Sequence, residues 1–201
     1  MAWYESLLNE DGELVVEAAP LGEDDLIPLT PELAEYIAAI LALEQDPEFT
    51  KLSEELRQKI YKDPELTKIC RDVFVGNGII FEVGGNTTAS YLNSAKTIYV
   101  ANEQIFTPGT EVFERNLLIL AHEIYHAGQS TYATTGFRRE EGEAYATVNS
   151  VEFMFRVGLG MPSGAIDGSN SGQANQIAGH YMAGEFDREE ALQRIENLPW
   201  N

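Results

Sequence analysis

The chain has 201 residues, of which 44% are hydrophobic, and this is enough for one domain with a substantial core. Its 33 acidic and 13 basic residues give a formal net charge of −20, which argues against nucleic acid and anionic membrane surfaces as partners. No apolar run is long enough to span a bilayer, the first residues show no secretory signal pattern, and the single cysteine, Cys70, excludes an internal disulfide. We therefore expect a cytoplasmic protein, and secretion by a route without such a signal stays open.

The pattern of elements predicts an α+β fold, in which a mostly helical domain at residues 30–201 carries a small antiparallel sheet. Residues 1–29 are expected to form an N-terminal arm. The expected parts of the domain, in chain order, are a helical half (30–76), the sheet (78–106), two metal-site helices (111–157) and two closing helices (173–197).

Three helix starts mark the helical half. Thr30, Asp46 and Asp63 each precede a Pro-Glu pair. Each therefore offers an N-cap oxygen, a proline at the first helical position and an acid near the positive helix end.

Two strand-like segments follow, at residues 78–83 and 96–101, and the next helix is expected to begin near Glu111. The second strand would lie next to that helix. Its edge could bind an extended peptide by adding a strand to the sheet, or it could simply cover the core.

The apolar helix that follows carries a His-Glu-x-x-His motif, with His122, Glu123 and His126. Residues four apart share a helix face, so the two imidazoles can serve as two ligands of one tetrahedral zinc. Glu123 can then reach the open coordination position, where it could take a proton from water. Two unpaired histidines in such an apolar helix would be costly to bury, which favours a metal over a plain core.

Beyond the motif, Gly128 is expected to let the chain turn into a loop at residues 129–136. A second strong helix is expected at 137–157, followed by a long loop rich in Gly, Ser and Asn. The closing helices are expected at 173–183 and 187–197.

A catalytic zinc usually has a third protein ligand, which the motif helix does not supply. In the metzincin pattern a glycine and a third histidine follow the motif, but Gln129 and Tyr132 stand at those positions. Cys70 is a weak alternative, because it lacks the glycine-containing cysteine motif of peptide deformylases. The third ligand is therefore sought on the next helix.

The segment Glu140–Ala146, read together with the motif, resembles the gluzincin class of zincin metallopeptidases, in a compact form. In that class a glutamate on a second helix completes the site, often in a Glu-x-x-Ala context. The resemblance implies Glu141 as the third ligand, because Ala144 follows it by three. Glu143 and then Glu140 are the alternatives, unless all three acids are solvated partners of nearby arginines.

The resemblance implies a zinc-dependent peptidase that acts on a peptide or protein substrate, with Zn²⁺ on His122, His126 and Glu141 and with Glu123 as general base. Tyr145, Tyr132 and His180 are candidates for the group that stabilises the oxyanion. Two alternatives stay open. The domain could bind zinc without turnover, as a protein-interaction module, or it could be a delivered effector or toxin protease with one host substrate.

Overall fold

The computed structural model of the chain describes residues 30–83, 89–100, 113–132, 139–162 and 164–200. The expected N-terminal arm, the end of the second predicted strand and the predicted helix start at Glu111 lie outside these ranges. The chain divides into two units, Met1–Ala34 and Glu35–Asn201, and the arrangement described below is that of the second unit.

Three helices open the described part of the chain: α1 (Pro31–Glu44), α2 (Glu54–Tyr61) and α3 (Pro64–Cys70). The predicted start of the third helix is confirmed, since the Asp63 carboxylate accepts the amide hydrogens of Glu65 and Leu66. A single π-helical segment, η4 (Arg71–Gly76), extends α3 toward the sheet. Phe74 of this segment lies against Phe49 and Phe81, at ring-centroid distances of 5.5 and 5.0 Å. These rings form the core between the helices and the sheet.

The predicted helix start at Asp46 is wrong. Its Oδ1 atom accepts hydrogen bonds from the backbone N–H groups of Glu48 and Phe49, but the turn that follows is only a short 3-10 helix, η3 (Phe49–Lys51). The α-helix begins later, where the Ser53 hydroxyl accepts the amide hydrogen of Leu56. Asp46 therefore caps a short local turn and does not start a long helix.

The sheet has three strands in the order β1 (Ile80–Val83), β3 (Thr97–Val100), β2 (Ala89–Leu92). β2 and β3 pair antiparallel, whereas β1 and β3 pair parallel, so the sheet is mixed and not antiparallel as expected. The reason is β2, which the sequence analysis did not predict. The chain reverses direction once between β1 and β2 and again between β2 and β3, and β3 therefore runs parallel to β1. β3 becomes the central strand, so the expected peptide-binding edge does not lie there.

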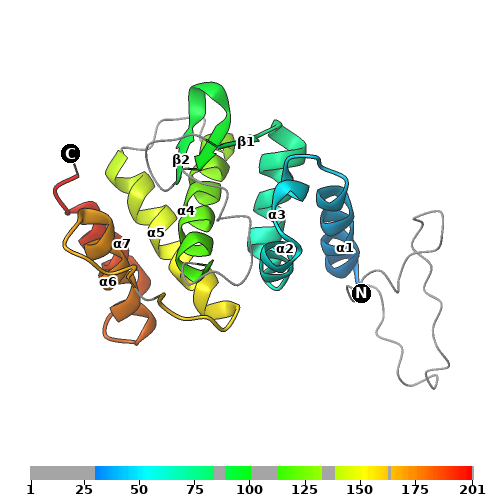
Figure 1. Cartoon of the computed structure of the whole chain (residues 1–201). Helices are drawn as coiled ribbons and strands as arrows, with labels where there is room; N and C mark the ends of the chain where they lie inside the picture. Colours follow the sequence, from blue (N-terminus) through cyan, green and yellow to red (C-terminus); the bar gives the residue numbers. More distant parts are fainter. Residues whose placement is uncertain (1–29, 84–88, 101–112, 133–138, 163, 201) are drawn as a thin grey trace, which may run out of the picture. The chain divides into compact units, whose positions relative to one another are not determined.

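Two long helices, α4 (Phe113–Tyr132) and α5 (Arg139–Arg156), pack side by side, and β2 lies along α4 (Figure 1). The prediction that Gly128 ends the first of them is wrong, because α4 continues for another turn. A β-carbon at Gly128 would lie 2.9 Å from Cγ2 of Ile69 in α3. The glycine is therefore explained by the close approach of α3 to α4 and not by a turn.

The closing helices are α6 (Asn170–Met182) and α7 (Arg188–Glu196), which pack against α5 on the side away from α4 (Figure 1). α6 begins earlier than expected, because the Ser169 hydroxyl accepts the amide hydrogen of Gly172 and caps it. The predicted α+β class, mostly helical with a small sheet, is confirmed. In the described ranges, no helix combines the length and apolar character needed to cross a bilayer.

Candidate metal centre

The two motif histidines lie one turn apart on α4, where the helix is deeply packed. Leu120, Ile124 and Tyr125 around them are fully buried, whereas the His122 and His126 side chains keep about a fifth of their surface exposed. Their Nε2 atoms face each other at 3.0 Å, with the ring planes at 82°. Two imidazole lone pairs at this distance repel each other unless a proton or a metal ion lies between them.

Glu143 of α5 completes the group. Its Oε2 atom lies 3.4 Å from Nε2 of His122 and 3.6 Å from Nε2 of His126. A tetrahedral zinc with bonds of about 2.05 Å separates its ligand atoms by roughly 3.3 Å. The three distances, 3.0, 3.4 and 3.6 Å, bracket that value. The residues present therefore fit a zinc ion in donor type, number and spacing.

The third side chain of the group is Glu143 and not Glu141, which the sequence analysis preferred. Ala144 and Val148 lie on the same face of α5 as Glu141. Both residues are fully buried, but so is Ala146 on the other side, because α4 covers one side of the helix and α6 and α7 cover another. Burial of small residues alone could not identify the side that faces α4. Glu141 and Glu140 are half-buried and lie outside the group.

Two features of the sequence are compatible with Glu143, although neither singles it out. Gly142 is a helix-interior glycine directly before it, and a β-carbon there would lie 3.9 Å from Cε1 of His126, so α5 faces α4 at this glycine. Glu143 also has an alanine three residues later, Ala146, and so matches the Glu-x-x-Ala context as well as Glu141 does.

The Glu123 carboxylate contacts the sheet. Its Oε2 atom accepts a hydrogen bond from the backbone N–H of Tyr91 in β2 at 2.7 Å. Because this N–H donates to a side chain of α4, it lies on the outer edge of β2, which is an edge strand packed along α4. A backbone donor to a carboxylate fixes its orientation. The strand that the sequence analysis missed thus positions the proposed general base.

The electrostatics of the group favour a cation. Burial opposes protonation of His126, but its hydrogen bond with Glu143 and the charge of Glu123 outweigh burial, so the pKa of His126 is raised. Burial acts to raise the pKa of Glu143, but hydrogen bonds with the two imidazoles outweigh it and lower that pKa far below its usual value. The field that attracts a proton to the histidines would equally attract a divalent ion.

The other sequence candidates lie elsewhere. The Tyr145 ring stands edge-on to Tyr125 at a centroid distance of 6.1 Å, and in the described part of the chain no hydrogen bond joins its hydroxyl to the metal group. His180 pairs through Nδ1 with Glu185 at 2.6 Å, on the exposed end of α6. Cys70 is fully buried in α3, where burial raises the pKa of its thiol far above the usual range, and it lies outside the group of possible metal ligands. The side chain of Tyr132 lies outside the described part.

No family model, curated protein or solved structure matches the chain at the significance required. The function is therefore inferred from the chemistry of the site.

Proposed function

We propose that the protein is a zinc-dependent peptidase whose metal ligands are His122, His126 and Glu143. The observation that carries the proposal is the convergence of two imidazole nitrogens and one carboxylate oxygen from two helices at the spacing of a tetrahedral zinc. Three protein ligands leave a fourth position open, as in catalytic rather than structural zinc sites.

Zinc bound there would lower the pKa of a water molecule toward neutrality and polarise a substrate carbonyl. Glu123 would accept the proton from that water and pass it to the leaving amine. Its hydrogen bond from the Tyr91 N–H supports this role, since it fixes the orientation of the carboxylate. A purely structural zinc site has no need for such a base. If the substrate backbone pairs with the sheet, β2 would be the strand it meets, because β1 and β2 are the edge strands and β2 is the one that lies along α4.

Metal binding is tested first, by zinc analysis and by competition against a chromophoric chelator. We expect about one zinc per chain, and we expect the affinity to fall more than about 100-fold in Glu143→Gln, because a direct ligand contributes more than the groups around it. Glu141→Gln is the matched control, with the same chemical change two residues earlier on the same helix. A wild-type protein without affinity for zinc would overturn the proposal, and a larger effect of Glu141→Gln would return the third ligand to that residue.

Catalysis is tested separately, with an unbiased peptide mixture as substrate. The Glu123→Gln protein should retain zinc and lose hydrolysis, because the amide cannot accept the proton. Cleavage that persists in this variant would remove Glu123 from its assigned role. Zinc binding by the wild type without cleavage of the mixture would overturn a peptidase of broad specificity and leave two alternatives, a protease with one narrow substrate and a non-enzymatic zinc-binding module.

A further inference from the structure

Gln129 lies one turn after His126 on α4, and its amide oxygen is 3.3 Å from Nδ1 of that histidine. Nδ1 is the ring nitrogen that does not belong to the metal group, because the distances within the group run to Nε2. The structure therefore pairs the far nitrogen of His126 with an acceptor.

A neutral imidazole carries one proton, on one of its two nitrogens. Only the tautomer with the proton on Nδ1 leaves the Nε2 lone pair free for a metal. A histidine ligand commonly donates this second N–H to an oxygen, which fixes both tautomer and ring orientation. The amide oxygen of Gln129 occupies that position for His126.

The surroundings of Gln129 argue against a role in stability alone. A β-carbon at Gly142 of α5 would lie 3.5 Å from Oε1 of Gln129, so the neighbouring helix covers the amide oxygen. The Nε2 atom of Gln129 is buried and has no hydrogen-bond partner in the described part of the chain. A buried donor without a partner costs about 1–3 kcal/mol, and a leucine would avoid that cost at the same helix position. Because the NH₂ group of Gln129 costs stability, the presence of this residue is explained by what its amide oxygen contacts.

We propose that Gln129 is a positioning residue that holds His126 in the Nδ1–H tautomer and in the orientation required to bind zinc. This inference rests on the proposed function, because it concerns a ligand of the proposed metal centre. The same tautomer of His126 is expected in the metal-free protein, where it can be tested without zinc.

The first test measures the tautomer in metal-free protein by long-range ¹H–¹⁵N correlation spectra, at a pH well above the histidine titration. We expect His126 in the Nδ1–H form in the wild type and in Gln129→Glu, which keeps an acceptor. Gln129→Leu removes the acceptor and should produce a mixture of tautomers. The Nε2–H form in the wild type would overturn the inference, whatever the affinity for zinc.

The second test measures zinc affinity and the absorption spectrum of the cobalt-substituted protein. Gln129→Leu should weaken zinc binding by about 10–100-fold and change the cobalt spectrum, whereas Gln129→Glu should stay within about threefold of the wild type. Glu114→Gln, an exposed change on the first turn of the same helix, is the control and should have no effect. Urea unfolding of the metal-free proteins checks for loss of stability, because Gln129→Leu removes an unpaired amide but also leaves Nδ1 of His126 without its acceptor. The cobalt spectrum is recorded on folded protein, so a change in it reports the geometry of the metal centre and not its stability.

The outcomes separate the two proposals. Wild-type protein that binds no zinc would overturn both the metal centre and the role of Gln129 in it. Normal zinc binding and an unchanged cobalt spectrum in Gln129→Leu, together with weakened binding in Glu143→Gln, would overturn the role of Gln129 alone.

Discussion

Two glycines near the metal group show how single residues control the approach of the helices. Gly128 of α4 faces α3, and Gly142 of α5 faces the His126 and Gln129 side chains. The space available to a β-carbon differs between them. At Gly128 the nearest atom, Cγ2 of Ile69, would lie at 2.9 Å, whereas at Gly142 the nearest atom would lie at 3.5 Å, an ordinary van der Waals distance.

Alanine substitutions should therefore act in opposite directions. Alanine favours a helix over glycine by about 0.5–1 kcal/mol, so Gly142→Ala should raise the free energy of unfolding by up to about that amount. Gly128→Ala gains the same preference but must displace Ile69, and overpacking typically costs about 1–3 kcal/mol, so a net loss is expected. Urea unfolding of the metal-free proteins measures both. Equal stability of the two variants would show that Ile69 moves aside and that close packing does not explain Gly128.

At the scale of single residues, the sequence predicts those contacts that depend only on the geometry within one helix. His122 and His126 lie on one helix, so their spacing alone predicts that their rings meet, and the structure brings them together. The contact with Glu143 depends on how α5 is rotated against α4, and spacing within α5 carries no information about that rotation. The hydrogen bond from Tyr91 to Glu123 could not be predicted either, because β2 is a short Ala-Ser-Tyr-Leu segment without a strong strand pattern.

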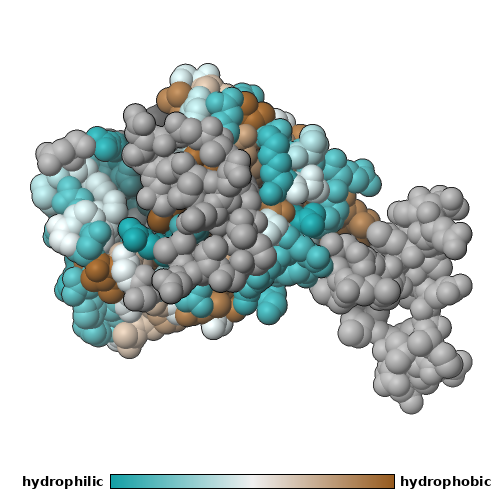
Figure 2. All heavy atoms as spheres, in the orientation of Figure 1, coloured by the Kyte–Doolittle hydropathy of each residue, from teal (hydrophilic) through white to brown (hydrophobic). Residues whose placement is uncertain are grey.

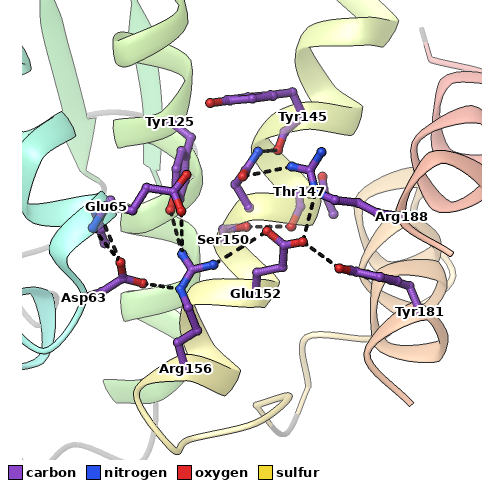
Figure 3. A network of polar contacts seen from close by, with 12 residues as sticks. Asp63, Glu65, Tyr125, Tyr145, Thr147, Ser150, Glu152, Arg156, Tyr181 and Arg188 are labelled. Carbon is purple, nitrogen blue, oxygen red and sulfur yellow. Dashed lines mark hydrogen bonds and ion pairs between the residues drawn. The ribbon is translucent and has the colours of Figure 1, made fainter. Parts of the chain in front are cut away.

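At the scale of elements, a polar network joins α5 to α3 on one side and to α6 and α7 on the other (Figure 3). Nε of Arg156, at the end of α5, donates to Oδ2 of Asp63 at 2.6 Å, and the Asp63 side chain is only 1% exposed. The same carboxylate caps α3 through its Oδ1 atom. Glu152 of α5 accepts hydrogen bonds from Tyr181 of α6 and Arg188 of α7 (Figure 3). α5 is thus tied to helices on both sides.

Removal of Arg156 should destabilise the protein strongly. Arg156→Met would leave the Asp63 charge buried without its cation, and loss of one partner of a buried pair costs about 3–5 kcal/mol. Because Arg156 itself is 36% exposed and Asp63 keeps two backbone donors, we expect a loss nearer to about 2–3 kcal/mol. Asp63→Asn in the same chain should recover part of this loss, since it removes the unpaired charge and keeps a capping oxygen.

The matched control for this pair is Arg194→Met, which breaks an exposed ion pair with Glu190 on α7. An exposed pair one turn apart contributes only about 0.3–0.5 kcal/mol. Urea unfolding should therefore separate the two arginine variants clearly. Similar losses in both would show that the pair with Asp63 contributes no more than a surface pair does.

At the scale of the whole molecule, the dominant property is charge. The full sequence carries an excess of 20 negative charges. Among the coloured residues on the face shown in Figure 2, hydrophilic ones prevail and apolar ones occur in small separate groups. Two effects of salt then oppose each other. Salt weakens exposed ion pairs such as Lys51–Glu48 and Arg194–Glu190, and it also screens the repulsion among the excess carboxylates.

The repulsion should dominate this balance, because exposed pairs contribute about 0–1 kcal/mol each and 33 acids compete for 13 basic residues. We therefore expect the melting temperature at pH 7 to rise when NaCl increases from about 0.02 to 0.5 M. A gain of about 1 kcal/mol would correspond to roughly 2–4 °C for a chain of this size.

The measurement needs a chelator throughout, so that bound metal does not contribute. The effect should shrink near pH 4.5, where about half of the glutamates are protonated. A melting temperature that falls with salt at pH 7 would mean that the ion pairs, and not the excess charge, dominate the electrostatic energy of folding.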